Sequence, residues 1–232
     1  MIKLVYGGSG SGKSKFAEEL AVSTKAERKY YVATMQVYDD EGWEKVARHR
    51  KLRAGKDFIT IEQPVCIGAV AERIKSDVAA RQNQQEARTA EMRQAAPTAK
   101  TAVLLECVTN LVANEMFPPE SDAGQSESTA GIEESLVVSS IKSGLEKLFS
   151  FADDIIIVSG NVFDDGAEYD ESTLAYMRAL GAVNAFIASK SDEVYEVVAG
   201  IPVKIAHQDK CAQLCGSGKM PRKAVARKAV KM

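Results

Sequence analysis

The sequence predicts an α/β fold in which a mainly parallel sheet carries helices on both faces, and three observations lead to this class. Short apolar runs typical of buried strands alternate along the chain with longer segments of helical period. A glycine-rich stretch separates the first strand from the first helix. Near residue 200, two strand-like runs flank a short turn, which indicates a terminal hairpin. Strands that alternate with helices are joined by crossovers, so most of the sheet should be parallel.

Each predicted strand is a short apolar run that stops at a turn signal. The runs cover residues 2–6, 29–33, 58–61, 101–105, 155–158, 193–198 and 201–205. The first ends at Gly7-Gly8, the third is closed by Pro64, and the last two flank Ala199-Gly200.

The predicted helices lie between these strands. They are expected at residues 16–22, 41–53, 66–95, after 105 up to 116, 132–151 and 174–189. In the second helix Trp43, Val46 and Ala47 share one face, as an amphipathic helix requires. After Asp77 the third helical pattern becomes polar and rich in Ala, Gln, Arg and Glu, so we interpret 77–100 as an exposed helical insert.

We expect a single domain over residues 1–205. Residues 118–131 contain Pro, Gly, Ser, Asp and Glu with almost nothing apolar, which predicts a mobile loop. Residues 206–232 form a basic tail, in which positions 216–232 carry six basic side chains and no acid. We interpret this tail as a solvated, frayed terminus.

The composition is that of an ordinary globular protein, with 45% hydrophobic and 27% charged residues among 232. A formal net charge of −2 predicts no general attraction to nucleic acid or to membranes. We see no signal-peptide pattern before the first strand and no run long and apolar enough to span a membrane. The four cysteines form no metal-binding pattern, so we expect reduced thiols and a cytoplasmic location.

The glycine-rich stretch has the chemistry of a phosphate-binding loop. It matches the P-loop pattern G-x4-G-K-[ST] and reads Gly7-Gly8-Ser9-Gly10-Ser11-Gly12-Lys13-Ser14. Glycines let successive backbone N–H groups converge on phosphate oxygens, and the following helix directs its positive end at the same anion. Lys13 should contact the β and γ oxygens of ATP or GTP, and the Ser14 hydroxyl should ligate Mg²⁺. The sequence therefore predicts a P-loop NTPase.

Glu106 is the candidate acid for the metal site. A P-loop site normally has a carboxylate at the end of another core strand to hold the metal and its water shell. Glu106 follows the apolar run 102–105. The alternative is a strand-end acid that faces water.

His49 is the candidate nucleophile, because the predicted helix 41–53 surrounds it with cations. Lys45, His49 and Arg53 fall at i, i+4 and i+8, away from the apolar face. A cationic environment favours the neutral imidazole, which can attack phosphorus, and it attracts polyphosphates. The alternative is a plain basic helix facing solvent. The other histidine, His207, lies in weakly patterned sequence and is interpreted as incidental.

Several motifs occur here in an order and spacing that together are specific. They are Gly7-Gly8-x-x-Ser11-Gly12-Lys13-Ser14; Tyr31-Val32-Ala33-Thr34-Met35-Gln36 with Asp39-Asp40-Glu41; Arg48-His49-Arg50-x-x-Arg53; Thr60-x-Glu62-x-Pro64; Leu104-Leu105-Glu106-Cys107-Val108-Thr109-Asn110 with Asn114; Leu180-Gly181-x-Val183-Asn184; and Asp192-Glu193-Val194 with Val198-x-Gly200-Ile201-Pro202-Val203. In these motifs residues 1–205 resemble the bifunctional adenosylcobinamide kinase/adenosylcobinamide-phosphate guanylyltransferase family of cobalamin biosynthesis.

The resemblance implies a RecA-like fold, often assembled as a homotrimer, with adenosylcobinamide, its phosphate, GTP or ATP, and Mg²⁺ as ligands. It also implies that His49 becomes covalently guanylylated. The positions that match the family's guanine-nucleotide contacts outside the P-loop are Thr34, Met35, Gln36, Arg50, Lys51, Leu52, Arg53, Glu62 and Glu106.

The chain departs from the family at two places. Gly10 stands where the family usually has Arg, and Asn161 stands where it often has Glu. We expect both departures to affect the kinase activity and to leave nucleotide binding intact. Two other functions stay open on the sequence: a P-loop kinase with a different small-molecule acceptor and an inert His49, and a nucleotide-dependent switch without transfer chemistry.

Overall fold

The computed structural model describes residues 1–37, 40–89, 100–118, 133–163, 166 and 168–207. Within them lies one seven-stranded sheet, in the order β3-β2-β4-β5-β1-β6-β7. The predicted loop at 118–131 falls almost wholly outside the described residues, as do positions 208–232 of the predicted tail.

The strands are β1 (Ile2–Gly7), β2 (Arg28–Ala33), β3 (Phe58–Glu62), β4 (Thr101–Glu106), β5 (Asp154–Gly160), β6 (Glu193–Val198) and β7 (Ile201–His207). All pairings from β3 through to β6 are parallel, and only β6 and β7 pair antiparallel, as the hairpin. The mainly parallel α/β fold with a terminal hairpin is therefore confirmed. His207 pairs with Glu193, so β7 rather than the tail holds residues 206 and 207.

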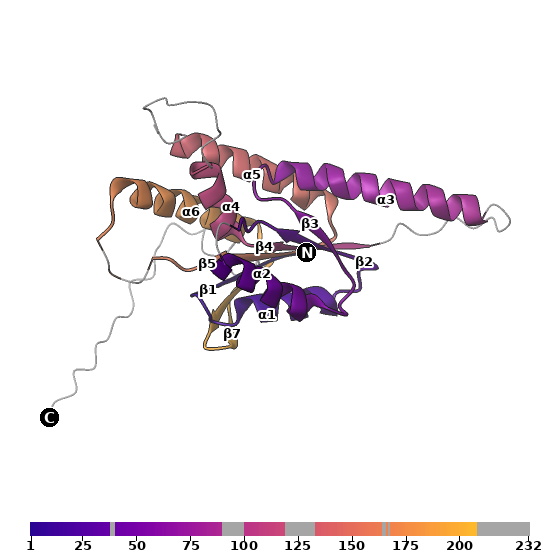
Figure 1. The fold of residues 1–232 in the computed structure, drawn as a ribbon, viewed down its shortest axis with the longest axis horizontal. Coiled ribbons are helices and arrows are strands. Elements are labelled where there is room, and N and C mark those ends of the chain that lie inside the picture. Colours follow the sequence, from indigo (N-terminus) through magenta and orange to yellow (C-terminus); the bar gives the residue numbers. More distant parts are fainter. Residues whose placement is uncertain (38–39, 90–99, 119–132, 164–165, 167, 208–232) are drawn as a thin grey trace.

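The helices are α1 (Lys13–Ser23), α2 (Asp40–Arg53), α3 (Gly68–Thr89), α4 (Val108–Met116), α5 (Glu134–Phe151) and α6 (Glu171–Lys190). Helices α3 to α6 lie on one face of the sheet, and α1 and α2 lie on the other (Figure 1). Within the described residues, no helix has both the length and the apolar character that crossing a membrane requires.

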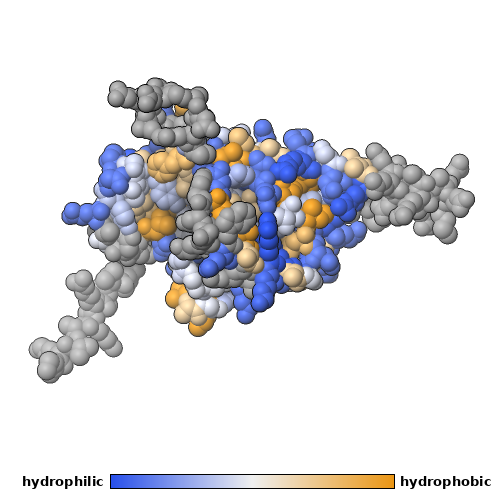
Figure 2. All heavy atoms as spheres, viewed as in Figure 1, coloured by the Kyte–Doolittle hydropathy of each residue, from blue (hydrophilic) through white to orange (hydrophobic). Residues whose placement is uncertain are grey.

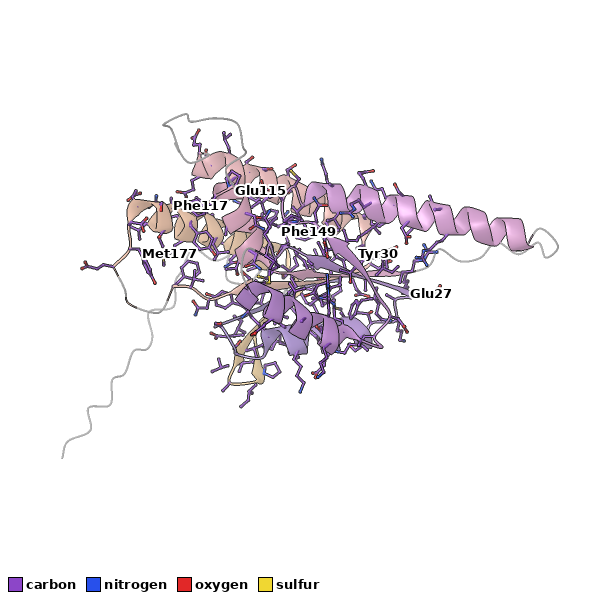
Figure 3. All side chains as sticks on the ribbon, viewed as in Figure 1. Glu27, Tyr30, Glu115, Phe117, Phe149 and Met177 are labelled. Carbon is purple, nitrogen blue, oxygen red and sulfur yellow. The ribbon has the colours of Figure 1, made fainter. Side chains whose placement is uncertain are left out.

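Two hydrophobic clusters fill the space on the two faces of the sheet. Consecutive strand residues point to opposite faces, so Leu4 packs toward α3–α6 whereas Val5 packs toward α1. Tyr30 and Tyr31 divide in the same way. The Tyr30 hydroxyl donates to Asp77 at 2.7 Å and so ties β2 to α3. Tyr30 is labelled in Figure 3.

Helix α3 extends well beyond the sheet (Figure 1). Its first turns bury Val70, Ala71 and Ile74, whereas residues 79–81 are exposed. The predicted polar extension is therefore helical as far as Thr89, and residues 90–99 lie outside the described part of the chain.

Candidate active site

The phosphate loop joins β1 to α1, as the motif predicted. Gly10 and Gly12 have φ angles of 68° and 92°, in the left-handed region that favours glycine. Gly12 is the N-cap of α1 and offers no side-chain cap, and the first turn of α1 has no acid. The first turn of α1 therefore contributes no carboxylate of its own that would compete with a bound anion.

Lys13, Ser14 and Glu106 come together at the end of this loop. The Lys13 ammonium donates to the Gly8 carbonyl at 2.9 Å, so it lies folded back over the loop. The Ser14 hydroxyl donates to Glu106 Oε1 at 2.5 Å. Strand β4 thus places its terminal carboxylate against the first turn of α1.

The Glu106 carboxyl group has the surroundings of a cation ligand. Burial raises its pKa to about 7, although the Ser14 hydrogen bond and the nearby Lys13 charge oppose this shift. Its Oε2 atom is buried and has no hydrogen-bond partner among the described residues. Among the described residues, no three His, Cys, Asp or Glu side chains gather as a metal cage. A hydroxyl and one carboxylate suit Mg²⁺, which fills its other positions with water and phosphate oxygens.

Thr34 links the ends of β2 and β4 behind this site. It is fully buried. Its hydroxyl accepts from the Cys107 N–H, and its single proton is donated to the Cys107 carbonyl at 2.8 Å or the Glu106 carbonyl at 3.0 Å. Asn114 donates to the Thr34 carbonyl at 2.8 Å. The Thr34 side chain therefore holds the strand end that carries Glu106, and the half-buried Met35 and Gln36 follow it.

An arginine groove lies beside the edge strand β3. It has a volume of about 500 Å³ and is lined by Arg50, Arg53, Thr60, Glu62 and Arg73. A smaller hollow of about 200 Å³ shares Arg50, Arg53 and Thr60 with it. Three guanidinium groups suit a polyphosphate or another anion, and Glu62 can accept from a base or a sugar. The structure thus brings three of the predicted nucleotide contacts, Arg50, Arg53 and Glu62, to one surface.

The last turn of α2 is held to the core by side chains. The Arg53 guanidinium lies 3.5 Å from the centre of the Tyr31 ring, a cation–π contact. Arg50 pairs with Glu62 at 3.5 Å between two exposed side chains. His49 lies in α2 as predicted, but its side chain and that of Leu52 lie outside the described atoms, and Lys51 is exposed.

The structure shows a buried ion pair that sequence reasoning missed. Glu18, on α1, is fully buried, and its Oε2 lies 2.5 Å from Lys56 Nζ in the turn after α2. Glu18 stands one helical turn after Ser14 and beside Ala17, which was the available signal for an inward-facing acid. Thr60 and Arg73 were also missed as lining residues, because no local pattern marks them.

The end of β5 lies against the start of the phosphate loop. The Asn161 N–H donates to the Gly7 carbonyl at 2.9 Å. The Gly160 N–H donates to the Thr109 hydroxyl at 2.7 Å, and a side chain on Gly160 would meet that hydroxyl. Asn161, one of the two departures from the family pattern, is therefore a neighbour of the loop.

The comparison with known proteins decides the family. The sequence profile described as cobinamide kinase / cobinamide phosphate guanyltransferase matches residues 3–205. The chain belongs to this family. It is therefore an enzyme of the kinase and nucleotidyltransferase class, as the motifs predicted.

Two curated relatives match over nearly their whole length. The bifunctional adenosylcobalamin biosynthesis protein CobU of Escherichia coli (strain K12) is 30% identical over 207 residues, which cover 88% of this chain and 99% of that protein. Its namesake from Salmonella typhimurium is 27% identical, with the same coverage. Among solved structures, a DnaB-like replicative helicase aligns with a TM-score of 0.42 and 11% identity over 84% of this chain and 46% of that one.

Proposed function

We propose that this enzyme phosphorylates adenosylcobinamide with ATP or GTP and then transfers GMP from GTP to the resulting phosphate, forming adenosylcobinamide-GDP. The observation that carries the proposal is the joint placement of a P-loop, a strand-end carboxylate and an arginine groove beside the helix that holds His49. The family relationship supplies the acceptor and the sequence of steps.

In the kinase reaction, the γ-phosphoryl group passes to a hydroxyl group of adenosylcobinamide. Lys13 and the backbone N–H groups of the loop would stabilise the charge on the phosphates, because positioning and electrostatics dominate phosphoryl transfer. Ser14 and Glu106 would hold Mg²⁺, which neutralises phosphate charge when bound. The buried, unpartnered Glu106 Oε2 supports this assignment.

In the guanylyltransferase reaction, the neutral His49 imidazole attacks the α-phosphorus of GTP, a nitrogen–phosphorus bond forms and pyrophosphate leaves. The phosphate oxygen of adenosylcobinamide phosphate then attacks the same phosphorus and releases the histidine. Covalent catalysis divides one difficult transfer into two in-line steps. Arg50 and Arg53, which line the groove and are close to His49 in the sequence, would hold the nucleotide.

A kinase with another acceptor and an inert histidine is the second candidate function. The observation that favours it is that the hydrogen bonds of the phosphate site do not involve α2. Lys13 donates to the Gly8 carbonyl and Ser14 donates to Glu106, and neither bond needs the helix that carries His49. The two candidates differ in the molecule that is phosphorylated and in the histidine step, since only the guanylyltransferase forms a GMP–histidine bond.

We also propose that residues 1–205 act as one domain and that the protein assembles as a homotrimer, as the family resemblance implies. The β6–β7 hairpin supports self-association, because Val198, Ile201, Val203 and Ile205 are exposed apolar side chains on an edge strand and its neighbour. Figure 2 shows apolar residues gathered at the hairpin, at the lower edge of the view. Light scattering on the purified protein measures the subunit number; a monomer at micromolar concentration would contradict the assembly.

The test of the proposed function uses the full chain with two assays. With ATP and Mg²⁺, adenosylcobinamide should be converted to its phosphate; with α-labelled GTP and adenosylcobinamide phosphate, labelled adenosylcobinamide-GDP should appear. Phosphorylation of adenosylcobinamide without GMP transfer would leave only the kinase half of the proposal. The second candidate would be favoured if adenosylcobinamide is not phosphorylated but another small molecule accelerates ATP use. Nucleotide hydrolysis that no acceptor accelerates would contradict both candidates and favour a switch.

A further inference from the structure

We propose that the turn between β6 and β7 positions the phosphate loop, with Gly200 as the positioning residue. This inference rests on the proposed use of the loop for nucleotide binding, and it adds a part of the molecule that lies outside the P-loop motif. The hairpin tip lies beside the start of α1, at the opposite end of the sequence (Figure 1).

The first contact is a hydrogen bond between two main chains. The Gly200 N–H donates to the Ser11 carbonyl at 2.8 Å. A trans peptide is planar, and its C=O and N–H point in opposite directions. Because the Ser11 carbonyl is directed at the hairpin, the N–H of Gly12, in the same peptide unit, is directed away from the hairpin. Gly200 therefore fixes the direction of a loop N–H that is expected to face the phosphates.

The second contact is the close approach of the two backbones. A Cβ atom built on Gly12 would lie 3.2 Å from the Gly200 Cα, and one built on Gly7 would lie 2.6 Å from the Val197 carbonyl oxygen. Two glycines of the motif thus leave room for the hairpin as well as for phosphate. The hairpin therefore borders the loop at both its first and its last glycine.

The hairpin is itself held firmly from the side of the core. Strand β6 pairs in parallel with β1, and Tyr6 stands opposite Glu196 in the register. Val197 is buried and belongs to the cluster that contains Ala17 and Ala21 of α1. The hairpin is therefore anchored to the same strand and helix that the loop connects. An arrangement of this kind orders the N–H groups before the nucleotide arrives.

Position 200 of the turn requires glycine because of its backbone conformation, and not because a side chain would lack room there. Gly200 has a φ of 82°, and no atom of the other described residues, its chain neighbours apart, lies within 4 Å of the position that its Cβ would occupy. Ala199 also has a positive φ, of 49°. A side chain at 200 would disfavour this backbone conformation and so displace the N–H that holds Ser11. The substitution would therefore act on the loop through the hydrogen bond alone.

The experiment measures the dissociation constants of Mg·GTP and Mg·ATP by calorimetry, with melting temperatures alongside. We expect Gly200→Ala to weaken the binding of both nucleotides by about three- to tenfold, the range for one hydrogen bond. Gly166→Ala is the matched control, because Gly166 has a φ of 68° and equally open surroundings. It should leave both constants unchanged. Gly200→Asn should bind nearly as tightly as wild type, because Asn tolerates a positive φ.

The outcomes separate this inference from the proposed function. Wild-type binding in a folded Gly200→Ala, or equal weakening in Gly166→Ala, would overturn the positioning role and leave the phosphate site intact. Wild-type protein that binds neither nucleotide would overturn the proposed function and this inference together. If Gly200→Ala does not fold, Ala199→Val replaces it, since a β-branched residue strongly disfavours positive φ. Unchanged binding in that variant would likewise overturn the proposal.

Discussion

The phosphate loop, which leads from β1 into α1, and helix α2, on the same face of the sheet as α1, are held in different ways. Main-chain hydrogen bonds from Asn161 and Gly200 fix both ends of the loop. Helix α2 is held at its last turn by side chains, through Arg53 on Tyr31 and through Arg50 and Glu62. The phosphate loop is thus ordered by main-chain contacts and would offer nucleotide phosphates a preformed site, whereas the groove that borders α2 depends on partly exposed charges.

The largest expected effect comes from removing the charge at the loop. Lys13→Ala should slow both the kinase and the guanylyltransferase reactions on the order of 10²-fold or more, because a transition-state charge loses its closest cation. Steady-state rates for the two reactions give the measurement. Lys15→Ala is the control, since Lys15 is 74% exposed and pairs only weakly with Glu19. Wild-type turnover in Lys13→Ala would refute the phosphate-loop assignment.

Glu106→Gln should raise the Mg²⁺ concentration needed for half-maximal activity. The variant keeps the size of the side chain but loses the negative charge that holds the cation. In the wild type, the carboxyl pKa of about 7 means that protons compete with Mg²⁺ below neutral pH, so the metal requirement should increase as the pH falls from about 8 to about 6. Glu106→Gln should lack that pH dependence. An unchanged metal requirement in the variant would make Glu106 a structural acid only.

In the absence of metal, Glu106→Gln should be more stable than the wild type at alkaline pH. A carboxyl group whose pKa is raised by folding stabilises the fold below its unfolded pKa, and this contribution is lost as the pH rises through about 7. The loss is on the order of 3 kcal/mol above about pH 7. Glu106→Gln should therefore melt higher than wild type at about pH 8, with a smaller difference at about pH 5. Glu72→Gln, at an exposed position, should melt at the same temperature as the wild type at both pH values.

The Glu18–Lys56 pair tests how α2 is attached to α1. Lys56→Met leaves a buried carboxylate unpaired, which should destabilise the protein by roughly 3 kcal/mol, the low end for such losses because Lys56 is 30% exposed. Chemical denaturation measures the change. The double variant Glu18→Gln/Lys56→Met should recover most of the lost stability. Lys75→Met, in an exposed pair on α3, is the control with little effect.

The smallest effect on stability is expected from Arg50→Ala. The Arg50–Glu62 pair is exposed and 3.5 Å long, so its loss should change the free energy of unfolding by about 0–1 kcal/mol. The KM for GTP in GMP transfer should nevertheless rise several-fold, because the groove loses one of its cations. A matching rise in the KM for ATP in the kinase reaction would show that the groove serves both nucleotides. No change in either KM would remove Arg50 from the site.

The sequence alone was sufficient to predict the features that depend on residues close together in the chain. The P-loop, its flanking strand and helix, and the strand-end position of Glu106 all follow from neighbouring residues, and the structure has them at the expected places. The helix that carries His49 was also predicted correctly, from the helical spacing of its apolar residues, although α2 begins one residue earlier than expected.

Contacts between distant segments could not be predicted in this way. Arg73 joins the groove only because α3 folds back beside β3, and nothing in its neighbourhood distinguishes it from other exposed arginines. Glu18 was overlooked because an acid in a helix is normally solvated, and its partner Lys56 lies two elements later. The Ala199-Gly200 turn was predicted as a hairpin, but its contact with Ser11 depends on strand order, which places β6 beside β1.

The most direct test of the account is whether GTP forms a covalent bond with His49. Wild-type protein incubated with α-labelled GTP and Mg²⁺, without acceptor, should carry label that is lost in acid and stable in alkali, as expected of a phosphoramidate. Mass analysis of its peptides should place the GMP on residues 48–53. His49→Ala should not be labelled yet should still bind nucleotide and phosphorylate adenosylcobinamide, whereas His207→Ala should behave as wild type. Covalent GMP in His49→Ala, or an unlabelled wild-type protein that still phosphorylates the acceptor, would contradict the guanylyltransferase assignment.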